Sequence, residues 1–249
     1  MLNKTRQSLK IKILFFYLSC VFVFLFTLQN KVLFMIKSKI LLLVLLSGIG
    51  IVMLAGRIAL TGTLAHWGLF WNLFLAWLPL GCAYMTLQFW QRGLLNHYGL
   101  LVGMMLWLLL FPNAPYLITD LIHLKEVPDY LLWYDSLMTF SFALAGLLTG
   151  FYSVLMIHRL IEQITHRITA WVIMAGCLIL SSYGVYLGRF GRWNSWDVLT
   201  NPFSLVKYSV SNLHNPMAMK LTITFSLAML IMYITFWIYT LKTKVEENV

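Results

Sequence analysis

The sequence predicts an all-α fold, a polytopic membrane bundle with six core transmembrane helices and an N-terminal segment that would add a seventh. Of its 249 residues, 61% are hydrophobic and only 10% are charged, and the mean hydropathy is +0.82. Such a chain has too little polar surface to cover a water-soluble globule. Apolar runs long enough to cross a bilayer recur along the chain, so its main partner is expected to be the lipid bilayer.

Residues 1–34 are predicted to be an N-terminal extension. Its apolar segment at 13–28 follows several basic residues and resembles a signal sequence, but no small-residue cleavage site follows it. An uncleaved anchor is one interpretation. In another, the core starts at Met35, which two lysines and an apolar run follow. Residues 35–249 are expected to form a single integral membrane domain.

Six core helices follow from the apolar runs that remain. They are predicted at residues 39–57, 67–89, 98–111, 130–157, 169–188 and 219–241. Three pairs of glycines spaced four residues apart predict close approaches between helices in the middle of the chain. The pairs are Gly99 and Gly103, Gly146 and Gly150, and Gly184 and Gly188.

The formal net charge of +10 is interpreted as topology rather than nucleic-acid binding, because Lys and Arg mark the cytoplasmic ends of membrane helices. Their distribution favours both termini inside by a narrow margin. In either orientation the 112–129 and 189–218 loops are two helices apart, so they are expected at the same membrane face. These two loops hold most of the polar sequence.

The first polar stretch begins where Pro112 and Pro115 are expected to end the third helix, since proline removes a backbone donor and restricts the residue before it. Non-helical backbone near membrane depth needs partners from protein or water. Asn113 and Tyr116 are therefore expected to face the bundle and to contribute to a substrate-binding site. The alternative is an ordinary interfacial turn.

Asp120 and His123 follow in a short helix that Thr119 is expected to cap. Their three-residue spacing brings the two side chains within mutual reach. Three interpretations are open: the aspartate orients a general base, the pair supplies two ligands to a divalent metal ion, or it holds the loop by hydrogen bonding.

Asp135 lies one turn into the fourth helix, before an uninterrupted apolar run. An ionisable group at that depth is costly unless it is paired. The predicted partner of Asp135 is Arg189 or Arg192, and we expect Asp135 to belong to the substrate-binding site.

The second polar stretch, 188–202, supplies the remaining predicted binding residues: Arg189, Arg192, Asn194 and Trp196. Guanidinium groups beside indole rings suit an anionic lipid head group or an envelope component, and they suit membrane anchoring equally. If Asp197 meets Asp120 and His123, two carboxylates and an imidazole would suffice for catalysis or for a divalent metal ion with open positions. No nucleotide-binding, zincin or serine-hydrolase motif occurs.

The strings PNAPYLITDLIHL, WYD and GRFGRWNSWDVLTNP together resemble an uncharacterised family of bacterial multi-pass membrane proteins, a domain of unknown function. The resemblance covers residues 40–240. It implies a bacterial cytoplasmic membrane and supplies no reaction. Its signature falls on Pro112, Asn113, Pro115, Tyr116, Thr119, Asp120, His123, Asp135, Gly188, Arg189, Arg192, Asn194, Ser195, Trp196 and Asp197.

Three functions are compatible with these features. An interfacial enzyme or binding protein would use the polar stretches on a lipid-linked or envelope substrate. A small-solute transporter would need polar residues deep in several helices, and the sequence offers few. A structural or assembly protein would use the same stretches to bind a partner; the oligomeric state is open.

Overall fold

The computed structural model describes the backbone of residues 32–246 and the side chains of residues 40–241. The apolar segment at 13–28 lies outside these residues. The chain divides into two compact units, 1–45 and 46–249, and the boundary falls inside helix α2 (Val32–Thr61). All side-chain contacts described below belong to the second unit.

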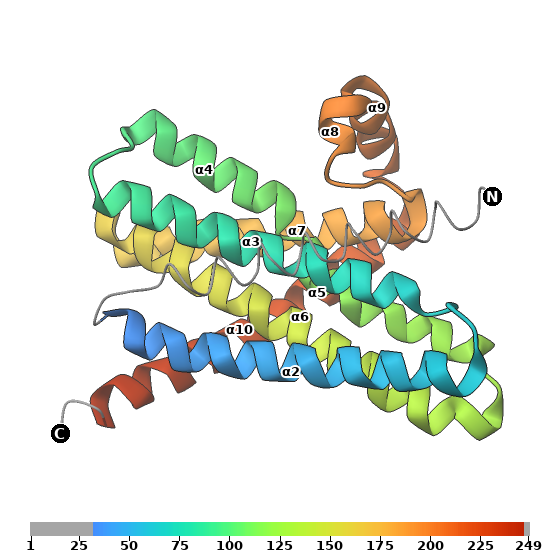
Figure 1. The fold of residues 1–249 in the computed structure, drawn as a ribbon. Helices are drawn as coiled ribbons and strands as arrows, with labels where there is room; N and C mark the ends of the chain where they lie inside the picture. Colours follow the sequence, from blue (N-terminus) through green and yellow to red (C-terminus); the bar gives the residue numbers. More distant parts are fainter. Residues whose placement is uncertain (1–31, 247–249) are drawn as a thin grey trace, which may run out of the picture. The chain divides into compact units, whose positions relative to one another are not determined.

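The described residues are helical and contain no strand, which confirms the all-α prediction. Six helical segments are long and apolar enough to cross a membrane, as predicted. Five of them are Ile40–Thr61 of α2, α3 (Trp67–Gln91), α6 (Asp129–Ile164), α7 (Arg167–Gly191) and Pro216–Leu241 of α10 (Pro216–Glu246). The sixth, His97–Glu126, combines α4 (His97–Leu110), α5 (Asn113–Thr119) and the 3₁₀ helix η1 (Asp120–Glu126). Two short helices, α8 (Asp197–Thr200) and α9 (Pro202–Asn212), connect α7 to α10 (Figure 1).

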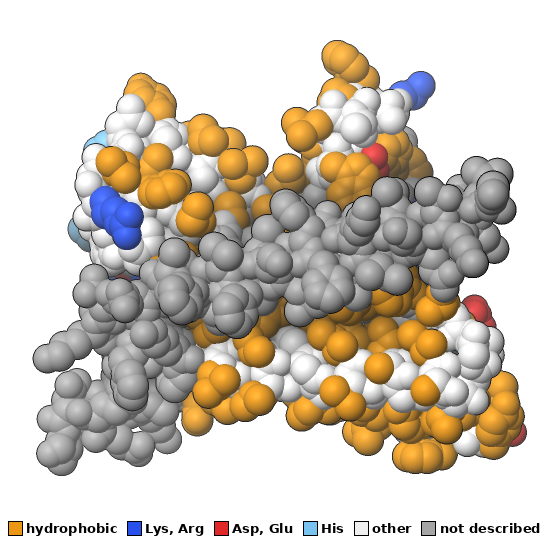
Figure 2. Space-filling view, viewed as in Figure 1, with side chains coloured by type: hydrophobic (Ala, Val, Ile, Leu, Met, Phe, Trp, Pro, Cys, Tyr) orange, Lys and Arg blue, Asp and Glu red, His pale blue; other side chains and the backbone are white. Residues whose placement is uncertain are grey.

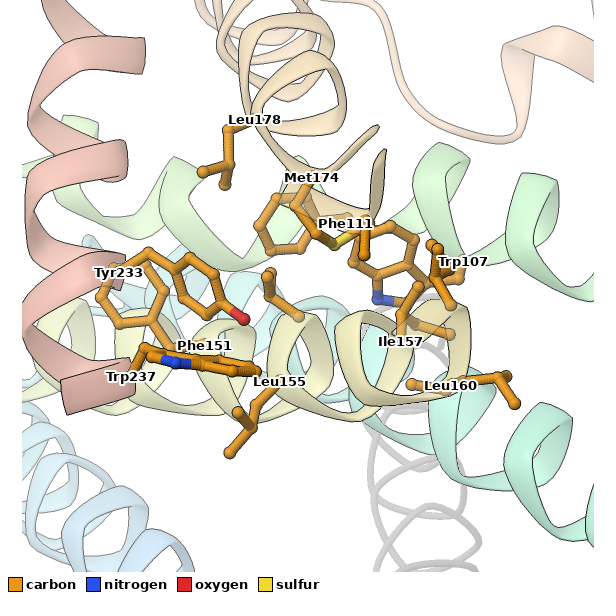
Figure 3. Packing of buried hydrophobic residues seen from close by; sticks show 14 of the residues in the cluster. Trp107, Phe111, Phe151, Leu155, Ile157, Leu160, Met174, Leu178, Tyr233 and Trp237 are labelled. Carbon is orange, nitrogen blue, oxygen red and sulfur yellow. The ribbon is translucent and has the colours of Figure 1, made fainter. Parts of the chain in front are cut away.

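Helix α6 is the central element of the second unit. Of its 18 most apolar consecutive residues, 67% are buried. The corresponding share is 39% or less in each of the other spans. Figure 3 shows its residues Phe151 and Ile157 among side chains from α4, α7 and α10. At the same level Trp107 donates from Nε1 to Ser153 Oγ at 3.1 Å. Helix α6, which also carries Asp135, is therefore anchored in a packed apolar core.

Residues 113–126 form helices, whereas non-helical backbone was predicted around the two prolines and only the short helix after Thr119 was expected. Phe111 keeps helical backbone angles, and Pro115 stands in the first turn of α5, where its missing N–H removes no helical hydrogen bond. Helix α5 packs against α3, α6 and α7 (Figure 1). The prediction that Thr119 caps the following helix was wrong, because its hydroxyl donates to Tyr116 O at 2.6 Å.

The glycine pairs make room for this inserted segment. A Cβ added at Gly146 would lie 2.9 Å from Ala114 O, and one at Gly150 would lie 2.9 Å from Ala114 Cβ. On α7, a Cβ at Gly184 would lie 2.8 Å from Pro112 Cγ. The predicted close approach is confirmed for α6 and α7, where the element that comes close is α5 or the residue before it. It is confirmed for α4 at Gly103, where an added Cβ would lie 2.7 Å from Thr86 Oγ1 of α3. At Gly99 the nearest atom belongs to Leu95, in the turn before α4, so this glycine makes no helix–helix contact.

Substituting Gly146 with alanine should destabilise the protein. The added methyl group meets backbone and the side chain of Leu117, and overpacking of this kind costs about 1–3 kcal/mol. Thermal unfolding in detergent measures the effect. The matched control is Gly176→Ala on α7, where an added Cβ has no atom within 4 Å. Equal melting temperatures for the two variants would contradict the tight α5–α6 contact.

Candidate functional site

Arg189, in the last turn of α7, joins the second polar stretch to the first. Its Nε donates to Thr119 Oγ1 at 2.8 Å, its Nη1 lies 2.9 Å from His123 Nε2, and its Nη2 donates to Asp120 Oδ1. The guanidinium carbon also stands 4.4 Å from the centroid of the Tyr116 ring. Asp120 is buried. Thr119, His123 and Tyr116 therefore all contact the arginine of the Arg189–Asp120 ion pair.

The other carboxylate oxygen of Asp120 receives a hydrogen bond from a third helix. Asn72 of α3 donates from Nδ2 to Asp120 Oδ2 at 2.9 Å. With partners on both oxygens, the carboxylate is fixed between α3 and α7. A charge in this position is tolerated because both of its oxygens are satisfied.

A second contact between the polar stretches involves Asn113 and Ser195. Arg192 takes the left-handed conformation (φ 57°), which ends α7 and turns the chain back toward α4. Asn113 Nδ2 then donates to Ser195 Oγ at 3.0 Å, and Ser195 donates to Leu109 O at 3.0 Å. These bonds, with those of Arg189, confirm that the two stretches lie together.

Asp135 pairs with Arg57 of α2 rather than with Arg189 or Arg192, so the predicted partner was wrong. Arg57 donates from Nε to Asp135 Oδ1 at 2.6 Å and from Nη2 to Oδ2 at 3.0 Å. The nitrogen Nε2 of His66 lies 3.2 Å from the same Oδ2. Asp135 has no exposed surface. Arg189 pairs with Asp120 instead.

Both ion pairs border one cavity of about 610 Å³, here called the polar pocket. Its polar wall residues include Arg57, His66, Asn72, Asp120, His123 and Arg189. They come from α2, the turn before α3, α3 itself, η1 and α7. Tyr116 also lines it, and Asp135 lies behind Arg57 and His66. Glu126 lines the pocket as well, so two arginines and three carboxylates converge at one end of an apolar bundle.

The contacts of the two histidines in the polar pocket favour protons on different ring nitrogens. Arginine can only donate, so His123 accepts at Nε2 from Arg189, and its proton stands on Nδ1. The carboxylate beside His66 Nε2 favours a proton on that nitrogen and leaves the lone pair on Nδ1. This is the arrangement of an aspartate-oriented general base. The two contacts thus leave Nδ1 of His66 and Nδ1 of His123 in opposite roles, as a lone pair and as an N–H.

We expect the two histidines to be opposite neutral tautomers. Nitrogen-15 chemical shifts distinguish protonated from lone-pair ring nitrogens, and His66→Gln and His123→Gln variants assign the signals. The expected result is a lone pair on Nδ1 of His66 and on Nε2 of His123. A lone pair on Nδ1 of His123 would contradict the Arg189 contact.

The other predicted site residues lie outside the polar pocket. Asp197 accepts from the backbone N of Asn194 at 2.7 Å and lies 3.2 Å from Thr200 Oγ1, so it organises the turn that enters α8. Trp196 stands at the start of α8 and is 41% exposed. Arg192 and Asn194 line a neighbouring pocket together with Asn113.

The predicted metal site is not assembled. Within the part of the chain that the structure describes, no group of three His, Cys, Asp or Glu side chains is placed to hold a metal ion. Asp120 and His123 both contact Arg189, whereas Asp197 contacts Asn194 and Thr200 in its own turn. The interpretation that Asp120 and His123 hold the loop by hydrogen bonding describes these contacts best.

Sequence reasoning missed Arg57 and His66 as site residues. Arg57 was interpreted only as a topology marker, although it follows seventeen residues of the apolar span that begins at Ile40. An arginine inside such a span needs a buried partner, and Asp135 was the carboxylate already identified as lacking one. The pairing of Arg57 with Asp135 could therefore have been predicted from the sequence. Nothing in the sequence marks His66, a histidine in a short turn, as a site residue.

Comparison with known proteins bears on the chain as a whole. No curated protein and no solved structure matches it. The model of one protein family, described as "Protein of unknown function (DUF1361)", matches residues 71–241. This range contains both polar stretches and most of the described helices, and it excludes Arg57 and His66. The chain therefore belongs to the DUF1361 family.

Proposed function

We propose that the polar pocket binds the anionic head group of a lipid-linked or other envelope substrate at one membrane face, with His66 as a general base. The observation that carries this proposal is the convergence of two buried arginine–carboxylate pairs, each joined to a histidine, on one pocket. Buried ion pairs add little to stability when apolar side chains would fill the same space. Ionisable groups inside membrane spans therefore favour a functional role.

The arginines keep donors for a ligand. Arg189 uses N–H groups on Thr119, His123 and Asp120, and a guanidinium carries about five. Arg57 gives two bonds to Asp135. Forked N–H groups that remain unused suit the oxygens of a phosphate or carboxylate. His66 Nδ1 would then accept a proton from a hydroxyl group or water held beside that head group.

Transport across the bundle is less well supported. The buried hydroxyls in the middle of α6 bond to their own helix: Thr149 donates to Ala145 O and Ser153 to Gly150 O, each at 2.7 Å. Hydroxyls satisfied in this way leave few groups to guide a solute. Asp135 and its partners Arg57 and His66 lie near the N-terminal end of α6, which suits a site at the membrane face.

A second candidate function is assembly with another protein, and α9 favours it. Phe203, Val206 and Val210 share one face of this helix and are 90%, 60% and 60% exposed. The same face would also suit insertion at the level of the lipid head groups. Assembly predicts that removing these apolar side chains changes the oligomeric state and leaves ligand binding in the polar pocket intact.

A cysteine-protection experiment tests the proposed binding site. The native cysteines are replaced by alanine, and Ala65→Cys places a reporter in the exposed part of the polar-pocket wall. Glycerol 1-phosphate should slow maleimide labelling at least three-fold, and uncharged glycerol at the same concentration should not. The mouth of the pocket would then be covered by the bound phosphate.

The control reporter is Thr63→Cys, which is exposed in the same turn but does not line the polar pocket. Its labelling rate should be unchanged by either compound. If glycerol 1-phosphate slows neither reporter, or slows both equally, the polar pocket is not an anion-binding site.

A further inference from the structure

A second cavity of about 510 Å³ adjoins the polar pocket, and its wall is rich in leucine. This leucine-walled pocket is formed by α3, α4, α5, α7 and the α8–α9 segment, and Asn113, Asn194 and Ser195 supply polar side chains to its wall. Its apolar side chains include Leu75, Leu108, Leu109, Leu180, Leu187 and Leu205. Figure 2 shows a hollow between the α4 and α8–α9 segments, with hydrophobic side chains on both sides. The leucine-walled pocket thus lies between segments that carry apolar side chains on their surface.

The two pockets share part of their walls. Asn72 and Tyr116 line both of them. Asn72 also donates to Asp120, and Tyr116 lies against Arg189. A ligand could therefore extend from the charged groups of one pocket into the apolar space of the other past these two side chains.

The α7 wall of the leucine-walled pocket is about as long as one leaflet of a bilayer is thick. Its α7 wall runs along one helix face from Leu180 through Gly184 to Gly188 and ends at Arg192. At a helical rise of ~1.5 Å per residue this wall is about 18 Å long, and half of a hydrocarbon core is about 15 Å. Arg192 is exposed and makes no ion pair within the described residues. It stands at the polar end of the wall, where a cation meets lipid head groups.

We propose that the leucine-walled pocket holds a hydrocarbon chain of the same molecule whose anionic head group lies in the polar pocket. The substrate class is then a membrane lipid or lipid-linked molecule that enters sideways from one leaflet. This inference rests on the proposed function of the polar pocket. It adds that the ligand is an amphiphile rather than a soluble anion.

Photo-crosslinking tests where the chain lies. The probe is a lysophosphatidic acid that carries a diazirine in its acyl chain, added to the full-length protein in detergent micelles. We expect its adducts on the pocket-facing residues of α4 and α7, around Leu108 and Leu180. Val198→Trp, which fills the leucine-walled pocket from α8, should lower the yield of these adducts at least five-fold.

The matched control is Leu199→Trp, on the next residue of α8, which is 84% exposed and does not line the pocket. It should leave the adduct yield unchanged. Adducts spread over α2 and α10 and insensitive to Val198→Trp would overturn the inference. If glycerol 1-phosphate still protects Ala65→Cys in that case, only the chain site fails; if it does not, the proposed function fails as well.

Discussion

Asp135→Ala is expected to destabilise the protein by about 3–5 kcal/mol, because it leaves the Arg57 guanidinium buried without its carboxylate. The pair is forked, with 8% and 0% of the two side chains exposed. Arg57→Ala should cost a similar amount, since Asp135 would then keep only His66 nearby. Reversible unfolding in mixed micelles measures both losses.

A double variant separates pairing from packing. Arg57→Met combined with Asp135→Leu removes both charges and keeps most of the volume, so it should recover most of the lost stability. Asp129→Ala is the control on the same helix: that carboxylate is exposed in the first turn of α6 and is worth about 0.3–1 kcal/mol. If Asp135→Ala costs no more than Asp129→Ala, the buried pair is not formed.

Arg189→Ala is the second substitution with a large expected effect. It removes the partner of buried Asp120 and the bonds to Thr119 and His123. Loss of one member of a buried pair costs about 3–5 kcal/mol. Arg189→Lys should recover only part of this, because an ammonium group cannot donate in three fixed directions.

Arg192→Ala provides the comparison for Arg189. Arg192 is exposed, so its removal should change stability by no more than about 0.5 kcal/mol. Asp120→Ala added to Arg189→Ala should cost less than the sum of the single changes, since both charges then disappear. Additive losses would show that the two side chains do not interact.

The sequence was sufficient to predict the six spans and the shared face of the polar stretches. Apolar runs reveal helices that cross lipid, and the parity of the spans fixes which loops meet; Arg189 and Asp120 meet accordingly. Asp135 was correctly expected to be buried and paired.

Partners across the bundle were harder to predict. Asp135 and Arg57 are 78 residues apart, and two other arginines competed for the same assignment. The path of 112–119 was mispredicted because proline was expected to end a helix, whereas here Pro115 stands in the first turn of a new one. Asp197 was assigned to the site because an aspartate that stabilises a local turn cannot be told from one that binds a ligand by residue type alone.

The measurement that tests the central claim most directly is magnetic dipolar coupling between phosphorus and nitrogen. Protein labelled with nitrogen-15 arginine is frozen with glycerol 1-phosphate in maltoside micelles, which contain no phosphorus. Binding in the polar pocket predicts coupling between the phosphate and guanidinium groups that weakens in Arg189→Lys, where Arg57 alone remains, and is unchanged in Arg192→Lys. No coupling in the wild-type protein, or coupling unchanged in Arg189→Lys, would contradict the account.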